Sequence, residues 1–161
     1  MAKSLVVLWL APAEPDRTFF QETIDRLARQ QGAPAFAPHL TFGRGSAAQL
    51  ETVNASTLEL PVRAIAVSEQ FTKTLFVRFN ETPELAALRD SLGIEAAGFD
   101  PHLSLLYKEM PVTEKEQLAG TISLPVTSVT FDRIEAVRCP DEPVTPENIP
   151  TWEIIASRPL R

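Results

Sequence analysis

Nearly the same five-residue phrase occurs twice in this chain, and the two copies contain its only two histidines. Residues 38–42 read PHLTF and residues 101–105 read PHLSL. In each copy a proline precedes the histidine, and a leucine and a hydroxyl residue follow it. One copy would be an ordinary accident of packing, but two copies that use every histidine indicate an internal duplication. We therefore expect an approximate two-fold axis that brings His39 and His102 to face each other.

The segments around the two phrases occur in the same order, which extends the repeat over most of the chain. Each passage contains a strand, a helix, the histidine strand, a second helix and a final strand. In the first passage we expect these segments at 5–10, 16–31, 38–42, from 46 onward and at 58–67. In the second passage we expect them at 74–79, 82–93, 101–107, from 113 onward and at 122–131. The sequence thus predicts a single domain, residues 1–161, with internal repeats at about 4–67 and 74–131.

Helix-start and helix-stop residues support this division. Asp16 is placed to cap the first helix, and Gly32 is placed to end it. The apolar face of this helix consists of Phe20, Ile24 and Leu27. Residues 46–49 (SAAQ) and 113–116 (TEKE) have the spacing of capping boxes, which predicts a helix start after the histidine strand in both passages.

Two further strands are expected at 133–138 and 152–157. The segment CPDEPVTPENIP (139–150) between them contains four prolines and three acidic residues. This composition predicts an exposed, conformationally restrained loop. Such a loop either covers a cleft or lies on the surface without a role.

Composition is that of an ordinary soluble globular protein, with 44% hydrophobic and 22% charged residues. The net charge of −6, without a cluster of lysine or arginine, argues against a long nucleic-acid partner. The apolar run near the start has about seven residues, against the roughly 20 needed to span a bilayer, so we expect no membrane association. The single cysteine, Cys139, excludes an internal disulfide and is typical of a reducing cytoplasm, where we expect a monomer.

The repeated phrase has a chemical interpretation. Side chains at positions i and i+2 of a strand share a face, so His39 lies beside Thr41 and His102 beside Ser104. Two such strands brought together would form a pocket with two imidazoles and two hydroxyls. That set suits acid–base chemistry on a phosphate: one histidine removes a proton, the other donates one, and the hydroxyls bind non-bridging oxygens. Histidine serves in both roles because its ordinary pKa is about 6.5.

Two alternatives explain the histidine phrases less well. A lone histidine in an apolar strand is usually a hydrogen-bonded core residue, but that does not explain the paired hydroxyls and prolines. A zinc site would need more ligands than two histidines, and no acid or cysteine lies at ligand spacing beside either. We therefore expect no metal site and no cofactor.

The two His-x-Thr/Ser motifs on a duplicated α+β chain resemble those of the 2H phosphoesterase superfamily. PHLSLLY at 101–107 is similar to the second motif of its cyclic phosphodiesterase family, and SLVVLWLAP, FAPHLTF and TWEII resemble that family's order of segments. The resemblance implies an α+β, bilobal, duplicated fold in which two antiparallel sheets line a central cleft, with helices outside. It also implies hydrolysis of 2′,3′-cyclic nucleotides or ADP-ribose 1″,2″-cyclic phosphate to monoesters without a metal.

Carried over onto this chain, the resemblance makes His39 and His102 the acid–base pair and Thr41 and Ser104 the phosphate contacts. Tyr107 matches a tyrosine of the motif that would lie near the phosphate. Strict alternation places Tyr107 on the opposite face from His102, which a bulge or the end of the strand after Leu106 would resolve.

Residues that recognise the rest of the substrate are less defined by the sequence. Trp9 matches a tryptophan of the family's first strand and either lines the cleft or packs in the core. Phe71, in the turn before the second passage, would stack on a base if the turn reaches over the cleft. The neighbouring Thr72 and Lys73 are candidates for contacts with a second phosphate.

The sequence thus predicts a metal-independent cyclic phosphodiesterase, with a small cyclic-phosphate nucleotide as its substrate. The nearer alternative is an RNA-end-processing enzyme, similar to the 2′-5′ RNA ligase-like members of the superfamily. A more distant alternative is a non-catalytic nucleotide sensor that uses the same cleft.

Overall fold

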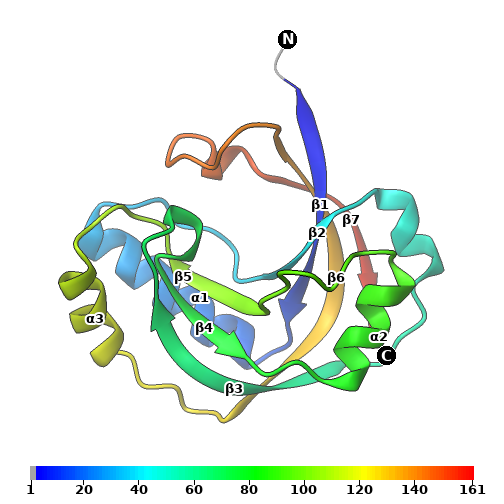
Figure 1. The fold of residues 1–161 in the computed structure, drawn as a ribbon, viewed down its shortest axis with the longest axis horizontal. Coiled ribbons are helices and arrows are strands. Elements are labelled where there is room, and N and C mark those ends of the chain that lie inside the picture. The colour runs from blue at the N-terminus through cyan, green and yellow to red at the C-terminus, as the bar shows by residue number, and fades with distance from the viewer. Residues whose placement is uncertain (1–2) are drawn as a thin grey trace.

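The computed structural model describes residues 3–161, and its elements follow the order expected from the repeat (Figure 1). The strands are β1 (Ser4–Pro12), β2 (Leu40–Arg44), β3 (Leu58–Val67), β4 (Leu75–Phe79), β5 (His102–Leu106), β6 (Ser128–Pro140) and β7 (Glu153–Pro159). The α-helices are α1 (Asp16–Gln31), α2 (Pro83–Ser91) and α3 (Val112–Gly120). Short 3-10 helices occur at η1 (Ala47–Thr52), η2 (Phe71–Lys73) and η3 (Ile149–Thr151). None of the helices in this described part is both long and apolar enough to cross a membrane.

All the strand pairs are antiparallel, and the seven strands follow the order β1-β2-β5-β4-β3-β6-β7. Because β1 also pairs with β6, the strands β1 to β6 close into a ring, to which β7 adds through β6. The expected α+β class with antiparallel strands is confirmed. The resemblance implied two antiparallel sheets, but the strands of the two halves are hydrogen-bonded to each other where β2 meets β5 and β3 meets β6. They therefore form one continuous sheet.

The pairing pattern is unchanged when the two passages are exchanged. If β1, β2 and β3 are exchanged with β4, β5 and β6, respectively, the ring β1-β2-β5-β4-β3-β6 keeps the same pairs of neighbouring strands. The last strand of each passage pairs with the first strand of the other, β3 with β4 and β6 with β1. This is the arrangement that an internal duplication predicts, although the duplication itself stays a prediction.

Three local expectations were wrong. The strands expected at 122–131 and 133–138 are one strand, β6, which begins at Ser128. The charged Asp132 in an apolar run suggested that the strand is interrupted there. The strand continues instead, and only its partner changes: β3 pairs with the residues before Asp132, and β7 pairs with the residues after it. Thr113 does not cap α3, which begins one residue earlier behind Pro111 without a side-chain cap. Asp16 is the first residue of α1 rather than its cap.

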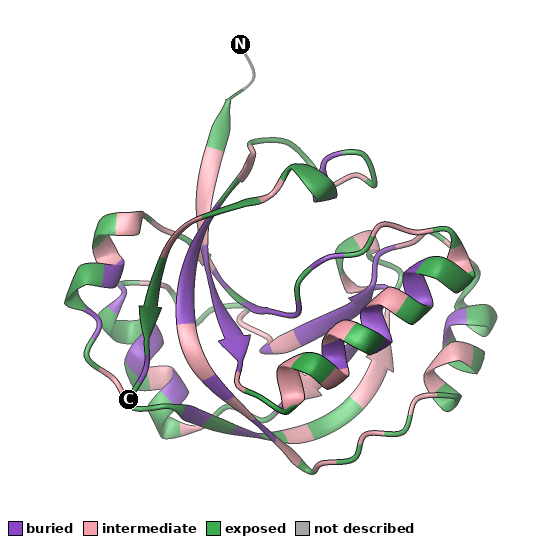
Figure 2. Ribbon diagram, turned by 180° about the vertical axis from the view of Figure 1, so that it is seen from behind, coloured by how far each residue is buried: buried purple, intermediate pink, exposed green. Residues whose placement is uncertain are grey.

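Helix α1 agrees otherwise with its sequence pattern. Phe20, Ile24 and Leu27 are buried, and the helix ends at Gly32 in the left-handed conformation (φ 64°) that favours glycine. The helix packs against β5 and β1. Figure 2 shows this long helix in front of the sheet, with buried and exposed residues on different sides. The apolar side of the sheet is thus covered, which leaves its other side for a site.

Each histidine strand contains a β-bulge at the same position of its phrase. Along β1 the partners change from Thr41 to Gly43 within one step, which leaves Phe42 as the extra residue of β2. Along β4 the partners change from Ser104 to Leu106, which leaves Leu105 as the extra residue of β5. Both extra residues lie three positions after the histidine. A bulge redirects the side chains that follow it, so alternation holds only up to this point.

The close contact behind β2 generates a test of the fold. Gly45 follows β2, and a Cβ at this position would lie 2.7 Å from Leu8 Cγ and 2.6 Å from Gln49 Oε1. Leu8 is fully buried, and Gln49 Oε1 accepts the Ser46 N–H at 2.6 Å, so neither has room to move freely. Gly45→Ala should therefore lower the free energy of unfolding by about 1–3 kcal/mol in urea denaturation.

The matched control is Gly120→Ala at the last residue of α3, where an added Cβ meets no atom within 4 Å. This substitution should leave the stability unchanged or raise it by up to about 1 kcal/mol, because alanine restricts the unfolded chain. Equal stabilities of the two variants would contradict the packing of Gly45.

Candidate active site

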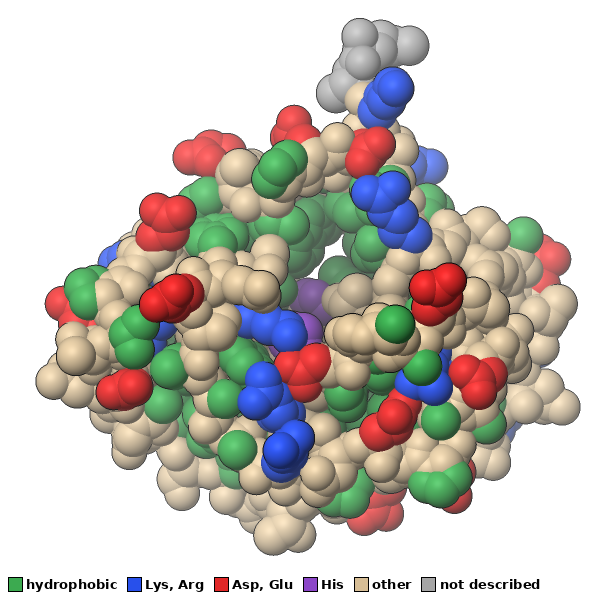
Figure 3. Space-filling view, viewed as in Figure 1, with side chains coloured by type: hydrophobic (Ala, Val, Ile, Leu, Met, Phe, Trp, Pro, Cys, Tyr) green, Lys and Arg blue, Asp and Glu red, His purple; other side chains and the backbone are tan. Residues whose placement is uncertain are grey.

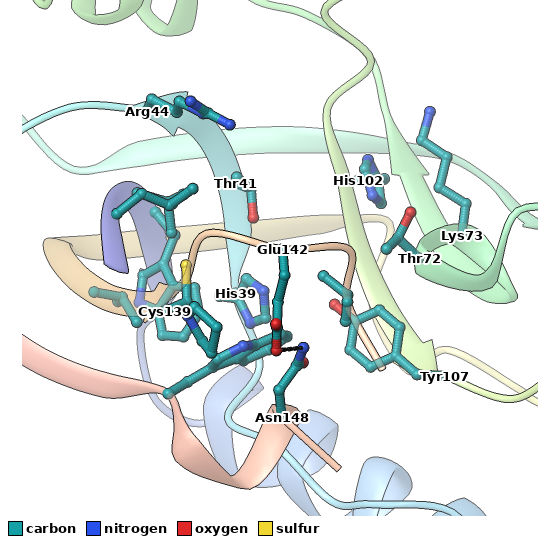
Figure 4. A pocket seen from close by; sticks show the side chains of 17 residues that line it. His39, Thr41, Arg44, Thr72, Lys73, His102, Tyr107, Cys139, Glu142 and Asn148 are labelled. Carbon is teal, nitrogen blue, oxygen red and sulfur yellow. Dashed lines mark hydrogen bonds between the residues drawn. The ribbon is translucent and has the colours of Figure 1, made fainter. Parts of the chain in front are cut away.

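The two histidine phrases meet at a cavity of about 360 Å³ on the uncovered side of the sheet. Its lining consists of Leu5, Val7, Trp9, His39, Thr41, Arg44, Thr72, Lys73, His102, Tyr107, Val137, Cys139, Pro140, Glu142, Val144, Asn148 and Trp152. Figure 3 shows the histidine side chains at the bottom of a hollow, with hydrophobic side chains on its upper wall and charged side chains around it. The structure thus brings His39 and His102 into one cavity from opposite halves of the ring (Figure 4).

Both imidazoles are fixed by the same hydrogen bond. His39 Nδ1 lies 2.7 Å from the Ala37 carbonyl oxygen, and His102 Nδ1 lies 2.7 Å from the Asp100 carbonyl oxygen. A carbonyl only accepts, so Nδ1 carries the proton in each neutral ring and Nε2 keeps a free lone pair. In both copies a proline lies between the carbonyl and the histidine, and its fixed φ restrains the short loop that the bond closes.

An aromatic ring from the neighbouring strand packs on each histidine. Trp9 lies opposite Thr41 in the sheet and stacks on His39, with ring centroids 3.8 Å apart. Phe76 lies opposite Ser104 and meets His102 edge-on at 5.3 Å. Trp9 is 4% exposed, so it packs in the core, and it also lines the cavity. Trp9 therefore has both of the positions that the sequence left open, in the core and at the cleft.

The indole of Trp9 has a buried partner. Trp9 Nε1 donates a hydrogen bond of 2.9 Å to Glu135 Oε1, and Glu135 is 6% exposed. This bond fixes the plane of the indole and therefore the plane on which the His39 ring rests.

Burial sets the charge state of both histidines. It lowers the pKa of His39 to about 4, with the nearby His102 acting in the same direction and the bond to Ala37 opposing it. Burial also lowers the pKa of His102; the bond to the Asp100 carbonyl opposes this, and Lys73 reinforces it. The rings of the free protein are therefore neutral near pH 7, each with Nε2 able to accept a proton.

A charged cluster lies beside His102, whereas the rings of Trp9, Phe36 and Trp152 lie around His39. Asp100 receives a two-point contact from Arg78, at 3.0 and 2.9 Å, and a 2.8 Å bond from Lys73 Nζ. Burial raises the pKa of the Asp100 carboxyl, but the bonds from Arg78 and Lys73 outweigh this and lower it. Lys73 lines the cavity, and its contact with a second phosphate stays a prediction. The sequence analysis missed Arg78, whose signal was its place in the alternating run opposite His102.

The two hydroxyls of the phrases lie in different environments. Thr41 is exposed to the cavity, and the hydrogen bonds among residues 3–161 do not involve its hydroxyl. Ser104 is 3% exposed, donates its hydrogen to the Thr72 carbonyl at 3.1 Å, and does not line the cavity. The Thr72 side chain lines the cavity near His102 instead (Figure 4).

Tyr107 lies at the cavity, whereas Phe71 does not. Strand β5 ends at Leu106 behind the bulge at Leu105, and Tyr107 then lines the cavity with His102. Burial raises the pKa of Tyr107 to about 12, so the phenol keeps its proton. Phe71 packs behind Tyr107, with centroids 5.9 Å apart, and lines a neighbouring cavity of about 310 Å³.

The proline-rich loop between β6 and β7 covers the cavity. Three of its residues line the cavity, Glu142, Val144 and Asn148, together with Cys139 and Pro140 at the end of β6. Figure 1 shows this loop as an arch above β5. Of the two roles left open for the loop, the structure selects the cover of a cleft. The sequence did not single out Glu142 or Asn148, because nothing in the loop composition shows which side chains turn inward.

No group of three or more histidine, cysteine, aspartate or glutamate side chains suited to hold a metal ion occurs within residues 3–161.

Comparisons with known proteins agree with this geometry at the level of the fold. No protein-family model and no curated protein matches the chain. Among solved structures, E. coli LigT in complex with phosphate superposes with a TM-score of 0.60 at 14% identity, over 99% of each chain. E. coli LigT in complex with 3′-AMP gives 0.59 at 13% identity over 98% of each chain. A structure described as a phosphoesterase gives 0.60 at 14% identity, over 98% of this chain and 99% of the other.

The chain therefore has the same fold as E. coli LigT. The α+β fold that the resemblance of the two histidine phrases implies is confirmed. Identities of 12–14% establish the arrangement of the chain, and the residue roles and the substrate stay predictions.

The burial of His39 predicts a pH dependence of stability. The pKa of His39 is about 4 in the folded chain against 6.5 for an unperturbed histidine, so between these values the unfolded chain binds a proton that the folded chain does not. The free energy of unfolding should therefore fall as the pH drops from 6.5 to 4, by about 3 kcal/mol at this site. The lowered pKa of His102 adds a loss of the same sign.

Urea denaturation across this pH window measures the effect. A His39→Gln variant should show a flatter pH dependence than the native chain, because glutamine does not titrate. Parallel curves for the two proteins would contradict the burial of a neutral His39.

Proposed function

We propose that this protein hydrolyses small cyclic phosphates to phosphomonoesters, with His39 and His102 as a general acid–base pair. The observation that carries the proposal is the matched Nδ1–carbonyl bond of both histidines, which leaves two Nε2 atoms for one cavity. The substrates are 2′,3′-cyclic nucleotides or ADP-ribose 1″,2″-cyclic phosphate. The fold supports the class, because structures that share it include a phosphoesterase and LigT.

The reaction requires two proton transfers. A water molecule attacks phosphorus while one Nε2 takes its proton, and the P–O bond to one ribose oxygen breaks while the other histidine protonates that oxygen. The product carries one phosphate on a single oxygen, and the proton gained by one imidazole replaces the proton lost by the other. The five-membered ring of the substrate is strained, and its opening assists the displacement.

The environments of the two histidines suggest their roles. His39 is 5% exposed and stacked on Trp9, and it resists protonation more strongly than the less buried His102. When the pair holds one proton, that proton therefore resides mainly on His102. His39 then serves as the base for water and His102 as the acid for the leaving oxygen.

The charge that develops on the phosphate meets donors from both halves. Thr41 offers a hydroxyl without another partner in the described part of the chain, and Lys73 and Arg44 offer positive charge. Donors placed in advance at such positions stabilise the transition state more than the ground state.

LigT structures support the size of the substrate. LigT has been crystallised in complex with phosphate and with 3′-AMP. A nucleoside 3′-phosphate is one of the two monoesters that opening a 2′,3′-cyclic phosphate gives. A cavity of about 360 Å³ suits a ligand of this size.

One observation favours a second candidate, the processing of RNA ends. The neighbouring cavity of about 310 Å³ shares Tyr107 and Val144 with the first, so the cleft continues past the tyrosine. A second nucleotide of a short RNA with a 2′,3′-cyclic end would lie there, with Phe71 available for stacking.

Phosphorus NMR of the chelator-treated protein with a 2′,3′-cyclic nucleotide tests the proposal. We expect conversion to one monoester, and the position of its phosphate identifies the leaving oxygen. His39→Ala and His102→Ala should each lower turnover by about 10²–10⁴-fold, because each removes one proton transfer. Near-native activity of either variant would show that the acid–base assignment is wrong.

The same measurement separates the alternatives. Faster conversion of a short RNA with a 2′,3′-cyclic end than of the mononucleotide would select RNA-end processing. Binding of both ligands without turnover would select the nucleotide sensor.

A substrate with a good leaving group distinguishes the base from the acid. In a nucleotide p-nitrophenyl diester the leaving group departs without a proton, so the acid is dispensable. His102→Ala should therefore recover most of its lost activity on this substrate relative to the cyclic nucleotide, whereas His39→Ala should not. Recovery by His39→Ala instead would reverse the two roles.

A further inference from the structure

The cavity extends from the two histidines into an apolar chamber whose floor is the β1–β6 ribbon. Leu5 lies opposite Cys139 and Val7 opposite Val137 in the register of the two strands, and all four line the cavity. Because cross-strand partners share a face, these pairs form a continuous flat surface. It has no equivalent on the side of His102, where Thr72 and Lys73 line the cavity. A flat apolar surface beside a phosphate site suits the face of a nucleobase.

The loop that covers this chamber is held by one buried side chain. Asn148 is 7% exposed; its Oδ1 accepts the Thr145 N–H at 3.1 Å, and its Nδ2 donates to the Pro143 carbonyl at 3.1 Å. Asn148 Nδ2 also donates to Glu142 Oε1, at 3.4 Å. At the other side of the loop Asp141 pairs with Arg44 at 3.5 Å. These contacts hold the segment that carries Glu142 over the chamber.

Glu142 is the single acidic residue among the described residues that line the cavity. Figure 4 shows it beside Asn148 and in front of His39, whereas Lys73 lies on the far side near His102. A carboxylate at this place repels phosphate and accepts hydrogen bonds. The character of the cavity therefore changes along its length. It is cationic near His102 and apolar beyond His39, where the Glu142 carboxylate provides a hydrogen-bond acceptor above the apolar floor.

We propose that the β1–β6 chamber is a base subsite and that Glu142 makes it selective for guanine. Guanine alone among the common bases presents two adjacent N–H donors, at N1 and N2, which match the two oxygens of one carboxylate. Adenine and cytosine place a lone pair beside their amino group, and uracil has a single N–H between two carbonyls. In each of these bases the neighbouring lone pair or carbonyl oxygen repels the second oxygen of the carboxylate. The inference rests on the proposed function, because it assigns guanosine 2′,3′-cyclic phosphate as the preferred member of the proposed substrate class.

The position of the tryptophans provides a direct test of binding. The chain has two tryptophans, Trp9 and Trp152, and both line the cavity. Their fluorescence therefore reports occupancy without any reaction. Titration with guanosine 3′-monophosphate should give a dissociation constant at least about 10-fold lower than titration with adenosine 3′-monophosphate. Inosine 3′-monophosphate, which lacks the 2-amino group, should fall between them.

Matched variants show whether Glu142 is responsible. Glu142→Gln should reduce the guanine-to-adenine preference by about 10-fold, because an amide offers one acceptor and one donor in place of two acceptors. Glu147→Gln changes an exposed acid of the same loop that does not line the cavity, and should leave the preference unchanged. Equal affinities in the native chain, or an unchanged preference in Glu142→Gln, would overturn the inference.

Turnover separates this inference from the function on which it rests. Conversion of guanosine and adenosine 2′,3′-cyclic phosphates with equal kcat/KM, together with equal binding, would overturn the guanine subsite and leave the phosphodiesterase standing. Selective binding of the guanosine monophosphate without conversion of any cyclic substrate would support the subsite and overturn the phosphodiesterase.

Discussion

The site depends on the meeting of two leucines. Leu40 of the first phrase and Leu103 of the second are the paired residues of β2 and β5, and both are fully buried. Each follows its histidine directly, so the histidines lie next to this pair and on the other side of the sheet. Burial of the apolar side of each phrase thus positions its polar side. The two histidines are not held together by attraction between polar groups. The hydrophobic contact of Leu40 with Leu103 behind them sets their separation.

The symmetric frame holds an asymmetric site. The bulges, the carbonyl bonds and the aromatic neighbours of the histidines recur in both halves, but the surroundings do not. His39 lies deep against Trp9, and His102 lies near the charged group of Asp100, Arg78 and Lys73. Acid–base chemistry needs two similar groups that differ in their affinity for a proton. The two matched phrases supply the similar groups, and the different neighbours supply the difference.

The features that the sequence predicted are those that follow from periodicity and repetition. The order of elements, the helix Asp16–Gln31 and the shared cavity of His39 and His102 all follow from spacing. The hydrogen bond of Ser104 to the Thr72 carbonyl was not predictable, because it depends on how the η2 turn folds back on β5. The bulge before Tyr107 was expected only because the resemblance placed Tyr107 near the phosphate, since composition does not mark it. The place of Glu142 at the cavity depends on the path of an irregular loop. Non-local backbone geometry, rather than residue type, decides each of these.

The exchange of strands between the passages has a consequence for the history and the folding of the chain. Because β3 completes the second passage and β6 completes the first, a protein made of one passage would present unpaired edges at both ends. It would be complete only as a symmetric dimer that contributes one histidine from each subunit. In this chain β3 and β4 are close in sequence, but the β1–β6 contacts join residues more than a hundred positions apart, such as Trp9 and Glu135. The ring therefore closes late, and the cavity forms only when the last long strand is in place.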